Sequence, residues 1–239
     1  MRKKTPLLNK VVLIGTIWGI LVLLLSVLLE PTPENFTLAV SIILSGVYTG
    51  FLYLTKRYWL PKTSKKPILS AILLGSYNAA VVEILFLVIE KVFGASGIAA
   101  HPNLLLDLVI TMPWYIGMVW IFTRVQKKQG FSTAGVLLLG AIYELGADGI
   151  VGGQIMPMIM GEQTNLITSL FFMLILAFWQ FIPVYSSMVL PPAWILESPQ
   201  REVIQAKLRW RQGLLPLLWL IPFSLYLIVL LLILGSLGL

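Results

Sequence analysis

The chain has 239 residues, 58% of them apolar and only 11% charged, and its mean hydropathy is +0.92. This composition excludes a water-soluble globular protein and predicts an integral membrane protein. The sequence has no cysteine, which excludes disulfides, thiolate metal sites and cysteine nucleophiles, and its net charge of +7 is spread over short separate segments, which disfavours nucleic acid as a partner.

Seven apolar runs follow one another along the chain, and each is long enough to cross a hydrocarbon core of about 30 Å as a helix. Their continuity predicts helices, because a transmembrane β-barrel has short segments of alternating hydrophobicity. We therefore predict an all-α polytopic integral membrane protein, a bundle of seven transmembrane helices that forms a single transmembrane domain over residues 1–239. The predicted spans are Val11–Leu29, Phe36–Leu54, Ile68–Phe93, Leu104–Thr123, Ser132–Met156, Leu166–Leu190 and Leu214–Leu237.

The basic residues predict which ends of these spans face the cytoplasm. Of the 17 Lys and Arg residues, all but Lys91 lie in the N-terminal tail or in the second, fourth and sixth gaps between spans. Because positively charged loops stay on the cytoplasmic side, we predict a cytoplasmic N-terminus and a C-terminus outside. Anionic headgroups of membrane lipids are the expected partners of these residues. The pattern suits the plasma (inner) membrane of a bacterium or archaeon.

The longest predicted inner loop contains a segment, residues 201–212, in which apolar side chains alternate with basic ones. Such a pattern is typical of an amphipathic helix that lies on anionic lipid. A solvated linker is the alternative interpretation. The apolar positions are Val203, Ile204, Leu208 and Trp210.

Acidic side chains inside spans three, four and five are the most informative polar residues. With a rise of about 1.5 Å per residue, they reach a similar depth in the outer half of the bundle. A charge at the centre of a bilayer costs about 2.5 to 3.5 kcal/mol, and Lys91 can neutralise at most one of these groups. We therefore expect the remaining carboxyl groups to be protonated, to share protons, to reach water or to hold a cation. The four residues are Glu83, Asp107, Glu144 and Asp148.

Span five brings two of these acids onto one face of a helix. Glu144 and Asp148 are four residues apart, and several glycines leave the rest of this span almost bare, so that a ligand or a neighbouring helix can approach closely. We predict that Glu144, Asp148 and Glu83 supply a general acid and a general base. The predicted substrate-binding residues are Asp107, Asn78, His101, Gln154, Tyr143 and Trp114. Plain helix packing is the alternative for each of them.

Three classes of function fit this pattern. The first is an intramembrane enzyme that performs acid/base chemistry on a lipid or isoprenoid substrate. The second is a proton- or cation-coupled transporter of a small solute, and the third is a noncatalytic subunit of a larger membrane complex. The odd number of spans and the absence of a visible internal repeat favour the enzyme.

Other chemistries find little support in the sequence. One His and no Cys disfavour a zinc site, so no metal ligands are predicted, although a harder cation held by carboxylate and amide oxygens stays an alternative. No phosphate-binding loop and no common hydrolase motif is present, so no particular cofactor is indicated.

Overall fold

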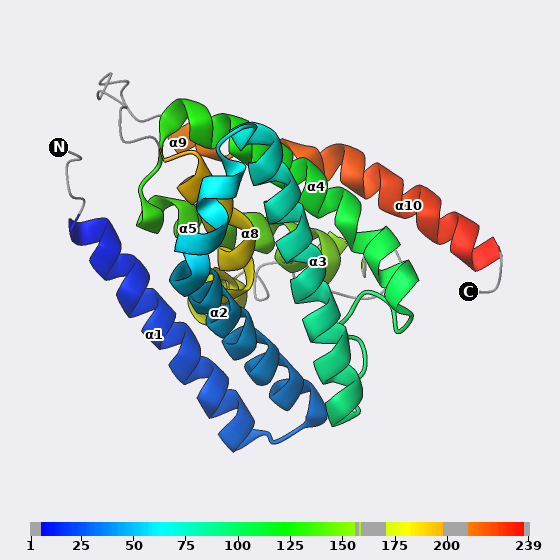
Figure 1. Ribbon diagram of the computed structural model, residues 1–239. Helices are drawn as coiled ribbons and strands as arrows, with labels where there is room; N and C mark the ends of the chain where they lie inside the picture. Colours follow the sequence, from blue (N-terminus) through cyan, green and yellow to red (C-terminus); the bar gives the residue numbers. More distant parts are fainter. Residues whose placement is uncertain (1–5, 156–157, 159–170, 198–209, 237–239) are drawn as a thin grey trace.

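A computed structural model describes residues 6–155, 158, 171–197 and 210–236, and within these ranges the fold consists of helices without a strand (Figure 1). Seven of the described helical segments are long and apolar enough to cross a membrane, which confirms the predicted all-α fold with seven apolar helices. Their bounds are Leu7–Leu29, Pro33–Thr63, Pro67–Phe93, Leu104–Gln129, Thr133–Gln154, Met173–Ile195 and Trp210–Ser236.

The first two helices form a hairpin. Helix α1 (Pro6–Leu29) and helix α2 (Pro33–Trp59) lie side by side and run in opposite directions (Figure 1). Thr32 begins α2, because its side chain accepts a hydrogen bond from the Asn35 amide at 3.2 Å, and the proline after it suits the first helical position. The short helix η1 (Leu60–Thr63) then connects α2 to the next span.

Helix α3 (Pro67–Phe93) ends at Gly94, whose φ of +68° lies in the left-handed region that favours glycine. After a loop, the side chain of Asn103 accepts hydrogen bonds from two backbone amides in the first turn of α4 (Leu104–Gln129). Ser132 caps α5 (Thr133–Glu144) in the same way. These caps fix where the spans begin, close to the predicted boundaries.

The fifth and sixth spans are not continuous α-helices, in contrast to the sequence-based expectation. After α5 the chain widens into a π-helix, η2 (Leu145–Ile155), which contains four glycines. Glycine has a weak preference for the α conformation, so this stretch can adopt the wider helix at little cost. Span six combines a π-helical turn, η3 (Met173–Ala177), a 3-10 turn, η4 (Phe178–Gln180), and α8 (Phe181–Ile195). The start of the predicted span, residues 166–170, lies outside the described residues.

The last span is a composite of α9 (Trp210–Gly213), η5 (Leu215–Trp219) and α10 (Leu220–Ser236). The predicted amphipathic segment, residues 201–212, lies outside the described residues up to position 209, and its final residues form the start of α9. Helix α10 extends away from the bundle, and much of its apolar surface is exposed (Figure 1).

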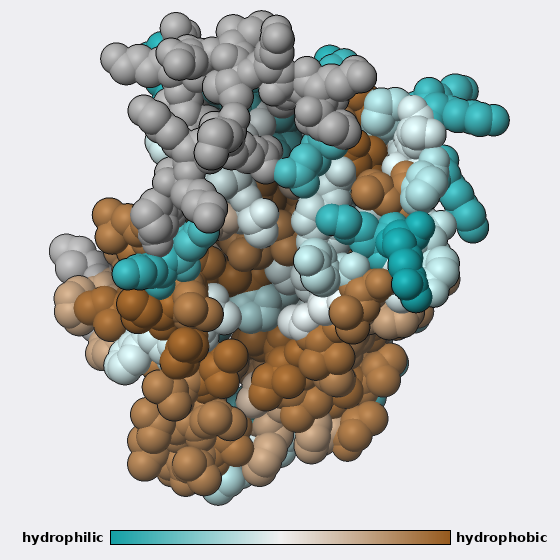
Figure 2. Space-filling model, turned by 60° about the vertical axis from the view of Figure 1, so that its left-hand side comes forward, coloured by the Kyte–Doolittle hydropathy of each residue, from teal (hydrophilic) through white to brown (hydrophobic). Residues whose placement is uncertain are grey.

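Helix α8 lies at the centre of the bundle and contacts α2, α3, α4 and α5. Nearly all of its side chains are buried, whereas α1 and α10 keep many large apolar side chains exposed. The hydrophobic core therefore lies between α3, α4, α5 and α8, where Met118, Tyr143 and Met188 are fully buried. An apolar surface covers much of the lower half of the molecule in Figure 2, and hydrophilic side chains gather in the upper half.

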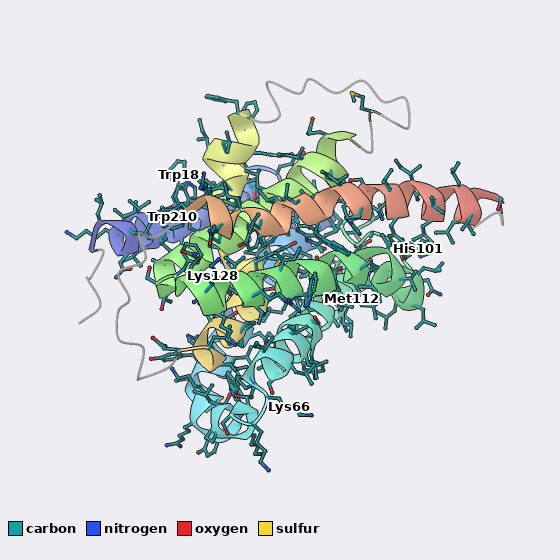
Figure 3. All side chains as sticks on the ribbon, turned by 90° about the horizontal axis from the view of Figure 1, so that it is seen from above. Trp18, Lys66, His101, Met112, Lys128 and Trp210 are labelled. Carbon is teal, nitrogen blue, oxygen red and sulfur yellow. The ribbon has the colours of Figure 1, made fainter. Side chains whose placement is uncertain are left out.

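Helices α4 and α10 run alongside each other in opposite directions, with His101 and Lys128 towards opposite ends of α4 (Figure 3). Pro113 lies inside α4 and removes one of its backbone hydrogen bonds, because proline lacks the amide that would bind the carbonyl of Val109. The hydroxyl of Tyr226 donates to that carbonyl at 2.7 Å, and the indole of Trp219 donates to the carbonyl of Pro113 at 2.9 Å. The last span thus supplies the hydrogen bond that the proline removes.

We expect Tyr226→Phe to lower the free energy of unfolding by about 0.5 to 1 kcal/mol, because the carbonyl of Val109 loses its donor in an apolar environment. Unfolding by denaturant in mixed micelles measures this change. The matched control is Tyr77→Phe on α3, since Tyr77 is exposed. Equal stability of the two variants would show that the Tyr226 hydrogen bond contributes nothing.

Candidate functional site

The structure brings the acids of spans three and four together. The carboxyl group of Glu83 on α3 lies within hydrogen-bonding reach of the carboxyl group of Asp107 on α4. Asp107 also accepts a hydrogen bond from the backbone amide of His101 at 3.2 Å, and the amide of Ala100 lies within reach. The loop before α4 therefore folds over this pair and holds Asp107 in place.

The two acids of span five form a second pair. The carboxyl groups of Glu144, the last residue of α5, and Asp148 in η2 lie within hydrogen-bonding reach of each other. The spacing of four residues keeps them adjacent although the helix changes from α to π between them. Two carboxyl groups can share a hydrogen bond only when a proton lies between them.

The two pairs face each other across the bundle. Asp148 interacts electrostatically with Glu83 and Asp107, and Glu144 interacts electrostatically with Glu83. We call these four residues the acidic cluster. Among the described residues no ion pair joins a Lys or Arg to the acidic cluster, and Lys91, in the last turn of α3, is exposed.

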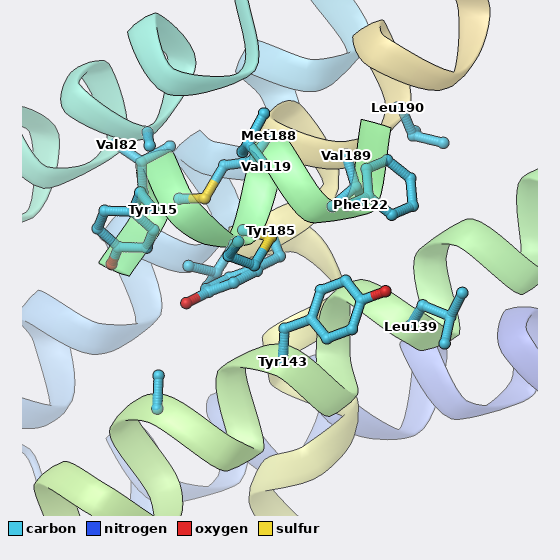
Figure 4. Packing of buried hydrophobic residues seen from close by; sticks show 14 of the residues in the cluster. Val82, Tyr115, Val119, Phe122, Leu139, Tyr143, Tyr185, Met188, Val189 and Leu190 are labelled. Atoms are coloured by element: carbon cyan, nitrogen blue, oxygen red, sulfur yellow. The ribbon is translucent and has the colours of Figure 1, made fainter. Parts of the chain in front are cut away.

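Aromatic side chains connect the acidic cluster to the core. The hydroxyl of Tyr115 donates a hydrogen bond to Glu83. The indole of Trp114 donates to the hydroxyl of Tyr185 at 2.8 Å, which leaves the proton of that hydroxyl free to point at Glu144, within hydrogen-bonding reach. Figure 4 shows the hydroxyls of Tyr115 and Tyr185 on one side of the core, and their rings meet edge to face at 5.8 Å.

Burial differs among the four acids. Asp107 is fully buried and Glu144 is 5% exposed, and one oxygen of each, Oδ2 and Oε2, has no hydrogen-bond donor. Asp148, in contrast, is exposed within the part of the chain that the structure describes.

Carboxylate side chains hold the loop between α3 and α4 by hydrogen bonds to its backbone amides. Glu90 accepts a hydrogen bond from the amide of Ala99, and Asp107 holds the amide of His101. The imidazole Nδ1 of His101 accepts a hydrogen bond from the amide of Asn103 at 2.9 Å, so this ring holds the loop together next to Asp107. Glu90 therefore helps to hold this loop in place.

Other predicted site residues lie elsewhere or reach the site indirectly. Asn78 is fully buried between α2, α3 and α8, where it accepts from Tyr48 and donates to the carbonyl of Ser187. The hydroxyl of Tyr143 donates to the carbonyl of Gly213 and points away from the other two tyrosines in Figure 4. Neither residue contacts the acidic cluster among the interactions that the structure describes.

Gln154 and Trp114 complete the set of predicted residues. Gln154 lies near the end of η2, is 6% exposed, and its Oε1 has no donor. Trp114 reaches the acidic cluster through its hydrogen bond to Tyr185. Across the described residues no group of three or more His, Cys, Asp or Glu side chains has the geometry to hold a metal ion.

Sequence reasoning missed the two tyrosines that touch the acids. Tyr115 lies eight residues after Asp107, which is a little over two turns of helix, so both share the inner face of α4. That spacing could have indicated Tyr115 as a site residue. Nothing in the sequence indicated Tyr185, because it belongs to span six and meets Glu144 only through the packing of α8 on α5.

Comparison of the chain with protein-family models, with characterised proteins and with solved structures finds no significant match. Its function is therefore inferred from the chemistry of the acidic cluster.

Proposed function

We propose that this protein is an integral membrane enzyme that moves protons to and from a lipid or isoprenoid substrate. The observation that carries the proposal is the pair of carboxyl groups of buried Glu144 and exposed Asp148, which lie within hydrogen-bonding reach of each other. Tyr185 lies within reach of Glu144. Isomerisation, hydration, cyclisation and hydrolysis all need such a pair of acid and base.

Each of these residues has a role in the proposed chemistry. Two adjacent carboxyl groups in an apolar environment hold one proton between them, so one acts as general acid while the other acts as general base. Tyr185, oriented by Trp114, keeps Glu144 in position. The Glu83–Asp107 pair faces this centre and is held by Tyr115 and by the loop before α4.

The proposed placement in the membrane follows from the charges. The start of α1, the connection from α2 to α3 and the end of α4 lie at one end of the molecule in Figure 1, and these segments carry most of the described basic residues. We propose that this end faces the cytoplasm and that the protein resides in a plasma (inner) membrane. The acidic cluster then lies towards the outer leaflet, which is the expected entry side for a lipid.

A proton-coupled transporter is the second candidate, and the breaks in spans five and six favour it. Transporters often carry their ion sites where a membrane helix is interrupted, and Glu144 lies where α5 changes into η2. A transporter would take up protons only together with a solute, whereas an enzyme would change the covalent structure of a lipid.

Solvent labelling separates these two functions. We expect the purified protein in nanodiscs, incubated with a lipid extract that contains isoprenoids in D₂O or H₂¹⁸O, to introduce the label into one lipid class, detected by mass spectrometry. Proton transfer to carbon brings in deuterium, and addition of water or hydrolysis brings in ¹⁸O. Empty nanodiscs are the control. The absence of label from every lipid class would contradict the enzyme, and solute-dependent proton uptake by proteoliposomes would then support transport.

A further inference from the structure

Hydrogen-bond acceptors outnumber donors at the acidic cluster. Each of its four carboxyl groups has two oxygens, and an ionised carboxyl group has no donor of its own. The donors that the described residues direct at these oxygens are the hydroxyls of Tyr115 and Tyr185 and the backbone amides of Ala100 and His101. Several oxygens are therefore left for protons or for a ligand that brings positive charge.

Buried oxygens without a donor point to such a ligand independently of the number of acids. Oδ2 of Asp107 is fully enclosed, and Oε2 of Glu144 belongs to a side chain that is 5% exposed. A buried acceptor without a partner costs about 1 to 3 kcal/mol, and more when it is charged. Both oxygens belong to carboxyl groups that face Glu83 and Asp148 inside the site, where a ligand can supply the missing donor or charge.

The surroundings of the acidic cluster disfavour an anion. His101, beside Asp107, is the one basic side chain that acts on these carboxyl groups within the described part of the chain. A phosphate, diphosphate or carboxylate near them would be repelled in a medium of low dielectric constant. The buried residues Tyr115 and Tyr185 place aromatic rings next to Glu83 and Glu144, and aromatic rings attract organic cations.

We propose that the acidic cluster recognises a positively charged organic group on an amphiphile that carries no phosphate or carboxylate next to it. This inference rests on the proposed function and narrows its substrate. The charge has two chemical sources: an ammonium group that the ligand already has, or a carbocation that forms in the site.

The carbocation arises when the acid of the Glu144–Asp148 pair protonates a carbon–carbon double bond. The proton and the π electron pair form a new C–H bond, the acid becomes a carboxylate, and the neighbouring carbon becomes positive. The reaction then ends when the base removes a proton from an adjacent carbon, or when water adds and gives up a proton to the carboxylate. Carboxylates and aromatic rings stabilise the positive charge in between.

The test compares the affinities of three probes that share a dodecyl chain and differ in charge. Each probe is titrated calorimetrically into the protein in phosphatidylcholine nanodiscs, and the heat measured with empty nanodiscs is subtracted. The probes are the dodecyl ether of choline, its neutral 3,3-dimethylbutyl isostere and dodecyl phosphate. We expect the cation to bind at least about tenfold more tightly than the isostere. Equal affinity of these two probes, or tighter binding of the phosphate, would overturn the proposal, and this comparison requires no variant.

Variants locate the charge preference in the site. Glu144→Gln combined with Asp148→Asn should remove the preference. Glu30→Gln combined with Glu34→Gln, which changes the charge equally where α1 leads into α2, should keep it. A preference that both double variants keep would place the cation elsewhere and overturn the proposal.

A primary dodecylammonium that binds more tightly than the quaternary probe indicates an ammonium ligand with N–H donors, and the reverse order indicates a carbocation.

The outcomes of the two proposals are separable. If no lipid takes up label while the cationic probe still binds more tightly than its neutral isostere, recognition of a cation is supported and the enzymatic function is contradicted. If label enters a lipid while the cationic and neutral probes bind with equal affinity, the enzymatic function is supported and recognition of a cation is contradicted.

Discussion

Glu144→Gln is expected to lower the rate of solvent-label incorporation by about 10²- to 10⁴-fold, the usual contribution of a general acid or base. Glutamine keeps the size of the side chain and can still hydrogen-bond to Tyr185, but it cannot release or take up a proton in this site. The rate is measured by mass spectrometry on the lipid that the wild-type protein labels, under single-turnover conditions in nanodiscs.

Glu34→Gln is the matched control, since it removes the same charge in the first turn of α2, away from the acidic cluster. We expect it to keep the wild-type rate. A Glu144→Gln protein that is folded, as judged by its melting temperature, and retains more than a tenth of the wild-type rate would exclude Glu144 from the chemistry.

Gly117→Ala is expected to destabilise the folded protein by about 3 kcal/mol, a large effect for the addition of one methyl group. A Cβ atom at Gly117 on α4 would overlap the indole ring of Trp219. That ring cannot move aside without breaking its hydrogen bond to the carbonyl of Pro113. The free energy of unfolding in mixed micelles measures the loss.

Gly50→Ala provides the comparison for this prediction. Gly50 lies inside α2, and a Cβ atom there would have no neighbour within 4 Å. Because alanine favours a helix over glycine, we expect an unchanged or higher stability, by up to about 1 kcal/mol. Equal stability of the two alanine variants would mean that Trp219 does not pack tightly on α4.

Several elements of the fold could be read from the sequence because they depend on local properties. The length and continuity of the apolar runs predict seven helices, and turn residues such as Gly94, Asn103 and Ser132 lie where helices end or begin. Two helical features lay beyond this reasoning. The π-helix after Glu144 and the composite span six depend on contacts with neighbouring helices, and apolar composition alone does not distinguish an α-helix from a wider one.

The sequence alone determined that carboxyl groups lie inside apolar helices without basic partners, because residue type and depth along a span are both local. Tertiary structure decided which of them meet. The rotation of each helix about its axis, set by the packing of α8 against α3, α4 and α5, turns Glu83 towards Asp107 and brings Tyr185 to Glu144. The same packing turns Tyr143 and Asn78 into other contacts. Helix rotation depends on long-range fits between side chains, which the spacing of residues within one helix does not specify.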